Sequence, residues 1–509
     1  MTNTLFDGLL ADVDPARAFA EIPGEGDIRT RWYTYEHIEQ VTARFAATLV
    51  AKGVKPGDRV AAQIPKSIEA LMLYLATVRA GAVFLPLNTA YTAAEVEYFI
   101  GDAEPKIFLC DPKSLDGYIG IAEKYRIHLD SFGVWRTPDT SAGTFFDAAE
   151  AQPASFETVA RDPDDLAAIL YTSGTTGRSK GAMLSHKNLL SNAETLVEAW
   201  RFTQDDRLIH ALPIYHTHGL FVASNTVIKA GGQLIFLSKF DPDAIIAHLP
   251  DATSLMGVPT FYTRLLAHAD FKKETTEHIR LFTSGSAPLL ADTHRAFEER
   301  TGHRILERYG MTETNMNTSN PYEGERRADT VGFPLPGVEL RIVDENVQPV
   351  SKSEIGTIEV RGDNVCQGYW RMPEKTKEEM REDGFFITGD LGMVDDDGYV
   401  VIVGRGKDLI ITGGFNVYPK EVESVIDDLP GVDESAVIGV AHPDFGEGVV
   451  AIVVGEGADE ATILSALSDK LANFKQPKRV FFVDALPRNT MGKVQKNVLR
   501  EEHAALFAS

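Results

Sequence analysis

The first 240 residues alternate between two patterns of apolar positions. In residues 35–52 and 67–80, apolar side chains recur about every 3.6 positions, which predicts amphipathic helices. Short apolar runs predict buried strands at residues 58–63, 82–88, 106–110, 166–170, 207–212 and 233–237. Helices that alternate with strands favour an α/β fold with largely parallel sheets.

The pattern changes near residue 335. Residues 335–403 contain short segments in which apolar and polar residues alternate, such as 356–362, with tight turns between them. Such segments are typical of antiparallel strands and predict a small β-barrel or antiparallel sheet. The α/β rhythm resumes after a glycine-containing stretch. We therefore expect a large N-terminal domain (1–404) and a small C-terminal α+β domain (405–509).

Composition limits the possible classes of function. The chain has 509 residues and a formal net charge of −24. This length predicts two or more domains, and the acidic balance argues against a nucleic-acid partner. On such an acidic protein, an anionic ligand must therefore bind where positively charged side chains are locally concentrated. Cys110 and Cys366 are too few for a disulfide framework and lack metal-ligand spacing.

Neither the N-terminus nor the most apolar window predicts contact with a membrane. The N-terminus carries Asp7, Asp12 and Asp14 and shows no signal-peptide pattern. The most apolar window, 70–87, is interrupted by an arginine, a glycine and a proline. We expect no membrane partner and a cytoplasmic location, with which two reduced cysteines are consistent.

The stretch 171–181 combines glycines, hydroxyl side chains and cations directly after a predicted strand. Glycines let backbone amides approach an anion, hydroxyls donate hydrogen bonds and a lysine neutralises charge, so this composition indicates phosphate binding. Ser179 and Gly181 depart from the Walker A pattern, so the loop is of another kind. A flexible surface loop would have a similar composition. The candidate residues are Thr172, Ser173, Gly174, Thr175, Thr176, Gly177 and Lys180.

Two later stretches could bind the rest of a nucleotide. Tyr309–Glu313 places an aromatic ring, a hydroxyl and a carboxylate close together, a set that can stack on a base and hold Mg²⁺. Asp390 follows Gly389 at the end of a predicted strand and could accept two ribose hydroxyls. Arg405 lies between two glycines, where its guanidinium is accessible to ribose or phosphate. Plain turns or a helix cap are the alternatives for these residues.

These motifs, in this order, resemble those of the acyl-adenylate-forming (AMP-binding) superfamily, which contains acyl-CoA synthetases, aryl-CoA ligases, luciferases and adenylation domains. The resemblance runs essentially from end to end and rests on residues 78–87, 171–181, 309–313, 388–390, 404–410 and Lys493. It implies two α/β subdomains and a small β-barrel, followed by a mobile C-terminal lid with a hinge near Lys407. It also implies an AMP-forming acid–thiol ligase that uses ATP, Mg²⁺ and coenzyme A.

By this resemblance, the nucleotide would contact three parts of the chain. The loop 172–180 would hold the β- and γ-phosphates, Tyr309 would stack on adenine, and Asp390 with Arg405 would bind the ribose. The expected adenine slot is completed by Ser286, Ala287, Pro288 and Glu307.

The catalytic residues implied by the resemblance are Lys493, Thr312, Glu313 and His216. Thr312 would contact the α-phosphate, Glu313 would hold Mg²⁺, and Lys493 would bridge the attacking carboxylate and the α-phosphate. An ammonium and a metal offset the repulsion between these two anions, so the enzyme needs no nucleophile of its own. The lid would then withdraw Lys493 and bring Gly413 and Gly414 toward the thiol of coenzyme A.

One arginine indicates the acid. A strand through 255–256 would lead into a helix that begins near Pro259, which puts Arg264 in the second helical turn. Fatty-acid and aryl-acid members usually carry an apolar or small polar residue there, whereas an arginine resembles the malonyl-CoA synthetases. A free second carboxylate needs a bidentate partner, which Arg264 could be, with Arg308 helping and His216 bordering the pocket. An Arg264 that faces solvent is the alternative.

We therefore expect malonate, ATP and coenzyme A to give malonyl-CoA, AMP and diphosphate through an acyl-adenylate, with methylmalonate as a second substrate. Two alternatives stay open: a CoA ligase for another short carboxylic or dicarboxylic acid, and a stand-alone adenylation protein that loads a carrier protein. Lys493 is also a candidate target of a lysine acetyltransferase, because acetylation removes its charge. The sequence leaves open whether the chain is a monomer or a homodimer.

Overall fold

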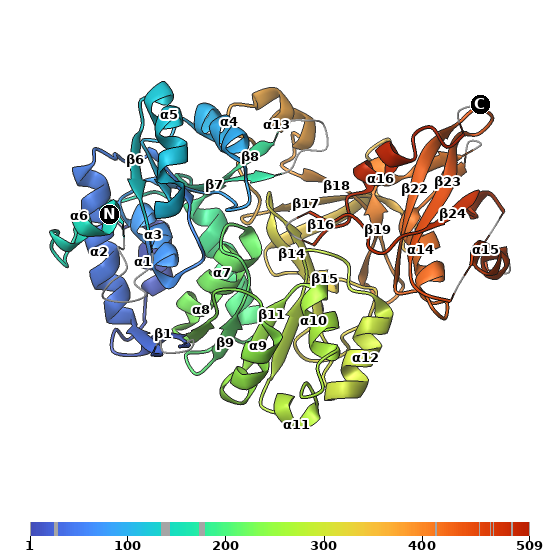
Figure 1. Cartoon of the computed structure of the whole chain (residues 1–509), viewed down its shortest axis with the longest axis horizontal. Coiled ribbons are helices and arrows are strands. Elements are labelled where there is room, and N and C mark those ends of the chain that lie inside the picture. The colour runs from blue at the N-terminus through green and yellow to red at the C-terminus, as the bar shows by residue number, and fades with distance from the viewer. Residues whose placement is uncertain are drawn as a thin grey trace.

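The computed structural model describes residues 2–24, 29–133, 143–172, 179–412, 415–457, 459–468, 470–471, 473–489 and 492–507. In this part of the chain the strands form four sheets. Two large sheets with their helices lie at one end of the molecule and a small C-terminal sheet lies at the other (Figure 1). The predicted α/β fold is confirmed.

A six-stranded sheet forms the first α/β subdomain. In spatial order its strands are β6 (His128–Ser131), β5 (Ile107–Cys110), β3 (Arg59–Gln63), β4 (Val83–Pro86), β7 (Leu166–Thr172) and β8 (Lys180–Ser185). Neighbouring strands are parallel except β7 and β8. The helices of this region are α2 (Tyr35–Ala51), α3 (Ile68–Arg79), α4 (Ala93–Ala103), α5 (Leu115–Tyr125) and α6 (Thr144–Glu150). Most of these bounds lie close to the ranges predicted from the apolar pattern.

Helix α3 is buried along its whole length, which explains why its sequence is almost entirely apolar. Ser67 caps the helix by accepting a hydrogen bond from the backbone N–H of Ala70 (3.0 Å). Gly81 follows its end in the left-handed region, at a φ of 73°, as expected for the glycine that closes this helix. The fully buried Glu69 pairs with Arg31 at 2.9 Å.

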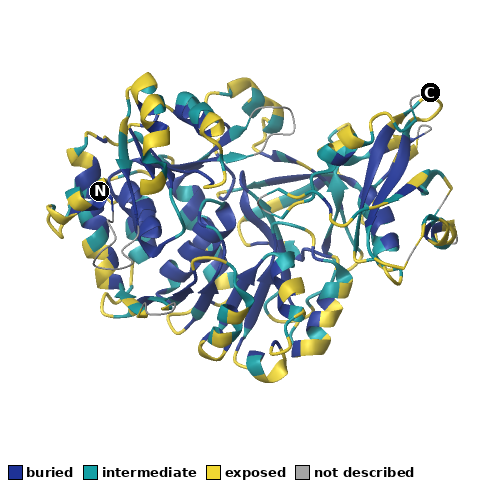
Figure 2. Ribbon diagram, in the orientation of Figure 1, coloured by how far each residue is buried: buried dark blue, intermediate teal, exposed yellow. Residues whose placement is uncertain are grey.

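A nine-stranded sheet forms the second α/β subdomain. Its spatial order is β15 (Phe333–Pro334), β14 (Asn315–Ser319), β13 (Leu306–Met311), β12 (Leu281–Ser284), β11 (Ser254–Gly257), β9 (Arg207–His210), β10 (Gln233–Phe236), β1 (Ala18–Ile22) and β2 (Arg31–Thr34). Pairing is parallel from β13 to β1 and antiparallel at both edges. The helices here are α1 (Thr4–Leu10), α7 (His186–Ala199), α8 (Ser224–Ala230), α9 (Pro242–His248), α10 (Pro259–Leu266), α11 (Lys273–Thr276) and α12 (Ala291–Thr301). Buried residues concentrate in the strands and exposed residues on the outer helical faces (Figure 2).

The predicted small barrel takes the form of a four-stranded antiparallel sheet. Its strands are β16 (Val338–Val343), β17 (Gly356–Gly362), β18 (Phe386–Val394) and β19 (Val400–Arg405). Helix α13 (Pro373–Glu379) lies between β17 and β18 in the sequence. Asp390, expected at the end of a strand, lies inside β18, because the strand continues past Gly389 through a bulge.

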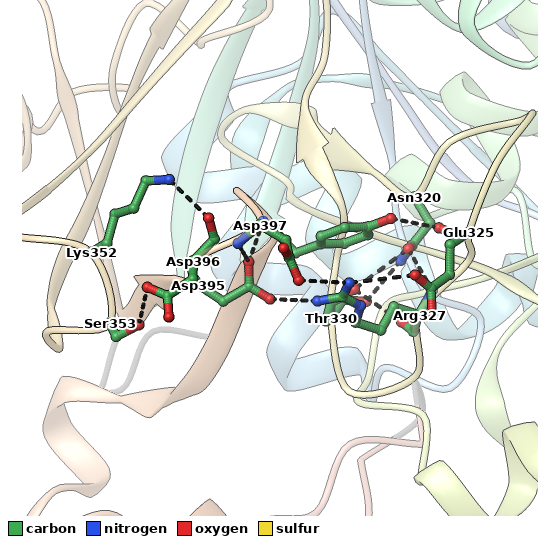
Figure 3. A network of polar contacts seen from close by, with 10 residues as sticks. Asn320, Glu325, Arg327, Thr330, Lys352, Ser353, Asp395, Asp396 and Asp397 are labelled. Atoms are coloured by element: carbon green, nitrogen blue, oxygen red, sulfur yellow. Dashed lines mark hydrogen bonds and ion pairs between the residues drawn. The ribbon is translucent and has the colours of Figure 1, made fainter.

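Arg327 fastens the loop before β15 to the turn between β18 and β19 (Figure 3). Its guanidinium pairs with Asp395 at 2.9 Å and with Asp397 at 3.0 Å. The same group lies 4.2 Å from the ring centroid of Tyr399. These contacts connect the nine-stranded sheet to the two strands that carry Asp390 and Arg405.

The C-terminal sheet contains β21 (Phe415–Val417), β20 (Ile410–Thr412), β23 (Gly446–Val454), β22 (Glu434–His442) and β24 (Arg479–Phe482). Its helices are α14 (Pro419–Asp427), α15 (Glu460–Ser468) and α16 (Lys496–Glu502). The boundary expected at 404/405 lies one residue before the end of β19, and the first strand of the C-terminal sheet, β20, begins at Ile410. Among the described residues, none of the helices combines the length and the apolar character that crossing a bilayer requires.

Candidate active site

The predicted ribose-binding pair lies on two neighbouring strands. The antiparallel register of β18 and β19 places Asp390 opposite Arg405, and Nε of Arg405 lies 2.7 Å from Oδ1 of Asp390. The hydroxyl of Tyr309, from β13, donates a hydrogen bond to Oδ2 of the same carboxylate. Burial raises the pKa of Asp390, while Arg405 and Tyr309 act in the opposite direction. The structure thus brings together the three residues predicted to bind the base and the ribose.

The loop after β12 carries other residues predicted to line the adenine slot. Ser286 has a φ of 71°, in the left-handed region, and its Oγ lies 3.2 Å from Nδ1 of His218. Ala287 is half-buried and Pro288 is exposed. Glu307 accepts a hydrogen bond from the backbone N–H of Leu289 (3.2 Å) and so ties the loop to β13. Burial raises the pKa of Glu307 to about 8.

Thr312 and Glu313 lie in the turn between β13 and β14, and both are buried. The hydroxyl of Tyr369 donates to Oε1 of Glu313 at 3.0 Å. Within the described ranges, no three His, Cys, Asp or Glu side chains are grouped as a metal site. Nucleotide-bound Mg²⁺ needs only one or two carboxylates, because phosphates and waters supply its other ligands. A single buried carboxylate at Glu313 fits that requirement.

The two ends of the phosphate loop are paired strands. Thr172 ends β7, Lys180 begins β8, and the two residues are register partners. The residues between them that we expected to contact phosphate, Ser173, Gly174, Thr175, Thr176 and Gly177, lie outside the described residues. The ammonium of Lys180 lies 2.9 Å from Oε1 of Glu379 and donates to the hydroxyl of Tyr369 at 3.1 Å.

The sequence reasoning missed Tyr369 and Glu379. Both lie far along the chain from Lys180, with Glu379 separated from it by 199 positions. Glu379 belongs to a short helix rich in glutamate and lysine, a pattern typical of a solvated surface. A local sequence signal therefore does not distinguish it.

Arg308, on β13 next to Tyr309, is a buried cation. Its side chain packs against Gly285, where a Cβ would come within 2.4 Å of the guanidinium carbon. Its Nε and Nη2 have no hydrogen-bond partner in the described part of the chain. Burial lowers the pKa of Arg308 to about 10, so it remains charged at neutral pH.

Several neighbouring polar atoms also lack a partner among the described residues. They are His216 Nδ1, Thr217 Oγ1, His218 Nε2, Thr283 Oγ1 and Ser284 Oγ. Burial, together with Lys493 and Arg308, lowers the pKa of His216 to about 3 and keeps the imidazole neutral. Buried polar groups are normally hydrogen-bonded, so this group of donors and acceptors suits a polar ligand.

Arg264 lies apart from these groups. It is exposed on α10, and its guanidinium lies 5.8 Å from the ring centroid of Phe240. Phe240 and Phe261 stack at 4.1 Å and form part of the wall of a cavity of about 470 Å³, which Ile214 and Tyr215 also line. Arg264 is thus connected, through Phe240, to the wall of this cavity.

Lys493 lies on an exposed turn between β24 and α16. Its backbone N–H donates to Oδ1 of Asn489 at 3.0 Å. A Cβ on Gly492 would lie 3.9 Å from Thr260, so the turn contacts α10. Water reaches Lys493, but the surrounding protein reduces the solvation of its ammonium; this desolvation, then the charge of Arg405, lowers the pKa of Lys493.

Asp390 and Glu313 act on the same ammonium in the opposite direction. The predicted catalytic lysine therefore lies close to both nucleotide-site carboxylates and to His216, whose pKa it lowers. Gly413 and Gly414, expected to approach coenzyme A, lie outside the described residues.

Comparison with known proteins identifies the family to which the chain belongs. Residues 16–370 match the AMP-binding enzyme family, and residues 421–493 match the AMP-binding enzyme C-terminal domain. MatB from Rhodopseudomonas palustris is 61% identical over 100% of both chains, with TM-scores of 0.95 to its ATP-bound crystal structure and 0.85 to its apo crystal structure. A malonate–CoA ligase from Arabidopsis thaliana is 38% identical over 486 residues, which cover 88% of this chain and 78% of that relative. The chain belongs to the family of AMP-binding enzymes.

Proposed function

We propose that this protein is a malonyl-CoA synthetase. It joins malonate to coenzyme A at the expense of ATP, through an acyl-adenylate, and releases AMP and diphosphate; methylmalonate is its second substrate. The observation that carries the proposal is the buried guanidinium of Arg308, whose Nε and Nη2 lack partners within the described residues. A compact dicarboxylate would satisfy these donors with the carboxylate that does not react. The similarity to a malonate–CoA ligase supports the same acid.

In the first half-reaction, the chain orients the reactants and neutralises charge. Tyr309 supports the adenine, and Asp390 and Arg405 hold the ribose. Lys493 places its ammonium where the attacking carboxylate meets the α-phosphate, which lowers the repulsion between them. Thr312 donates to the α-phosphate, and neutral His216 borders the acid. Glu313 would hold Mg²⁺, which supplies positive charge to the phosphate oxygens when it is bound.

The acid's second carboxylate has two candidate partners. Arg308 is buried beside His216 and His218, and its charge lowers the pKa of both. Arg264 is exposed and is connected, through Phe240, to the wall of the cavity. We assign the contact with the second carboxylate of the bound acid to Arg308. Arg264 would contact the acid only while it enters or while the site closes. This order reverses the emphasis that the sequence alone suggested.

The proposal divides the chain at 404/405, with a hinge near Lys407 and a C-terminal lid. Two facts support this division. β19 ends at Arg405, and the next strand, β20, begins at Ile410 in a different sheet. In the second half-reaction the lid would turn, and Gly413 and Gly414 would face the thiol. Acetylation of Lys493 would remove the charge needed for the first half-reaction only.

A panel of acids tests the proposal. The purified protein is supplied with ATP, Mg²⁺, coenzyme A and one of malonate, methylmalonate, acetate or a medium-chain fatty acid, and AMP and acyl-CoA are measured. We expect the highest kcat/KM with malonate, followed by methylmalonate. Acetate turnover as efficient as malonate turnover would refute the assignment. AMP formation without acyl-CoA formation would favour the carrier-loading alternative.

A further inference from the structure

The lysine at the end of the phosphate loop already has an anionic partner. Lys180 lies 2.9 Å and 3.1 Å from the two carboxylate oxygens of Glu379. The ammonium also lies 4.2 Å from the ring centroid of Tyr369. With 16% and 21% of their side chains exposed, Lys180 and Glu379 are shielded from water. A shielded pair is stronger than an exposed one, because water and salt screen it less.

The backbone places Glu379 at this position. The segment before α13 runs along β8: Gln367 donates to the carbonyl of Met183 at 2.9 Å, and Trp370 donates to the carbonyl of Gly181 at 2.8 Å. This pairing sets Tyr369 beside Lys180. The backbone N–H of Tyr369 donates to Oγ1 of Thr376 at 2.9 Å. Thr376 lies one helical turn before Glu379, so the helix is held with its last residue facing the lysine.

Tyr369 connects the pair to the predicted metal carboxylate. Its hydroxyl donates to Glu379 and to Oε1 of Glu313, the latter at 3.0 Å. A tyrosine hydroxyl keeps its proton at neutral pH. One hydroxyl carries one proton and serves one carboxylate fully at a time. Glu379 and Glu313 are therefore coupled through a shared donor.

Glu379 stays ionised in this position. Burial acts to raise the pKa of Glu379, but hydrogen bonds from Tyr369, Lys180 and Lys375 outweigh it and hold the pKa below its ordinary value. The negative charge of Glu379 thus lies beside the ammonium of Lys180, which would contact the phosphates of ATP in the proposed function.

We propose that Glu379 competes with phosphate oxygens for the ammonium of Lys180 and takes the ammonium back when diphosphate leaves. This inference rests on the proposed function, in which Lys180 contacts the β- and γ-phosphates. ATP must displace Glu379 from Lys180 to bind, so the carboxylate lowers the affinity of the site for phosphate. The same competition speeds the departure of diphosphate, because the lysine gains a new partner as it loses the old one. Glu379 is a positioning residue that acts through Lys180.

Binding of Mg²⁺–diphosphate and Mg²⁺–ATP to the full-length protein, measured by calorimetry, tests this competition. Glu379→Gln keeps the size of the side chain and removes its charge. Hydrogen bonds to charged groups are stronger than those to neutral ones, so we expect diphosphate to bind roughly 5- to 10-fold more tightly to the variant. ATP affinity should rise in the same direction, and diphosphate should inhibit turnover at correspondingly lower concentration.

Three further variants separate competition from a structural role. Glu378→Gln alters the next residue of α13, whose side chain is 65% exposed and pairs with Lys375, and should leave both affinities unchanged. Glu379→Asp keeps the charge and should stay near the wild-type affinity. In a Lys180→Met background, Glu379→Gln should no longer tighten binding, because the contested cation is gone.

Weaker or unchanged binding of diphosphate to Glu379→Gln would overturn the inference, since Glu379 would then orient Lys180 for phosphate or act only on the fold. Tightening that persists without Lys180 would overturn it too. If the wild-type protein binds neither Mg²⁺–ATP nor Mg²⁺–diphosphate, the proposed function itself fails. The two failures are therefore distinguishable.

Discussion

Replacing Arg308 with methionine should make the protein more stable and less selective. Methionine retains most of the aliphatic length but carries no charge. In the ligand-free site, burial lowers the pKa of Arg308 from 12.5 to about 10. At about 1.4 kcal/mol per pKa unit, keeping the guanidinium charged there costs about 3 kcal/mol at neutral pH. The missing atoms would leave a small void that costs about 1 kcal/mol. The free energy of unfolding should therefore rise by roughly 2 kcal/mol.

The second carboxylate of malonate is what offsets this cost in the wild-type protein. Without Arg308, the preference for malonate over acetate or propionate should fall by about 10²-fold, which corresponds to the same energy of about 3 kcal/mol. ATP binding should change little, because Arg308 contacts the acid in the proposed function. Arg264→Ala provides the comparison: its side chain is exposed, so we expect a smaller loss of selectivity and no gain in stability.

Urea denaturation without ligands and kcat/KM for malonate and propionate test both parts. A lower free energy of unfolding for Arg308→Met would show that the guanidinium has partners in the resting protein. Unchanged selectivity for malonate would assign the second carboxylate to another residue. Either result would refute the reasoning about an unsatisfied buried cation.

Three other variants test separate parts of the site. Lys493→Ala should reduce adenylate formation by more than about 10²-fold and leave thioester formation from supplied malonyl-adenylate largely intact; equal loss in both assays would contradict its assigned role. Glu307→Gln should change the pH dependence of stability. The pKa of Glu307 is raised from 4.5 to about 8 in the fold, so its contribution to stability is lost as pH rises through that window. The variant should lose this decline and be more stable than wild type by roughly 2–5 kcal/mol at pH 9, but not at pH 4, in urea denaturation. Arg327→Ala should lower the melting temperature, because it removes three ion pairs, with Glu325, Asp395 and Asp397, and the contact with the Tyr399 ring; an unchanged melting temperature would show that the network contributes nothing.

The sequence predicted the elements well where burial dictates the pattern. β17 spans 356–362 as expected, and α2 differs from its predicted range by one residue. Strands buried on both faces and helices with one apolar face leave periodic signals that tertiary contacts reinforce. The position of Asp390 was wrong in detail, since a positive φ at Gly389 lets β18 continue where the glycine suggested an end.

The sequence named candidate residues for the site but not the contacts among them. The pairing of Arg405 with Asp390 depends on the register of one hairpin, which their spacing does not fix. The pairing of Lys180 with Glu379 depends on the segment 367–370, which is distant from β8 in the sequence but pairs with it in the fold. The sequence favoured Arg264 over Arg308, because the exposure of Arg264 on α10 depends on packing that the sequence does not show.

Two ion pairs hold the loop that carries Lys493 to the C-terminal sheet and its helices. Arg488 pairs with Glu434 on one side of the lysine, and Lys496 pairs with Glu423 at 2.6 Å on the other. All four residues belong to the C-terminal sheet, its helices and the loops between them, so these two ion pairs would move together with the loop. We therefore expect its shape and its delivery to the nucleotide to fail independently. If the chain from residue 405 onward were replaced by the corresponding segment of a relative, the loop with the equivalent lysine should keep its shape. Only the surface by which the new segment docks on the N-terminal part would need to be adapted.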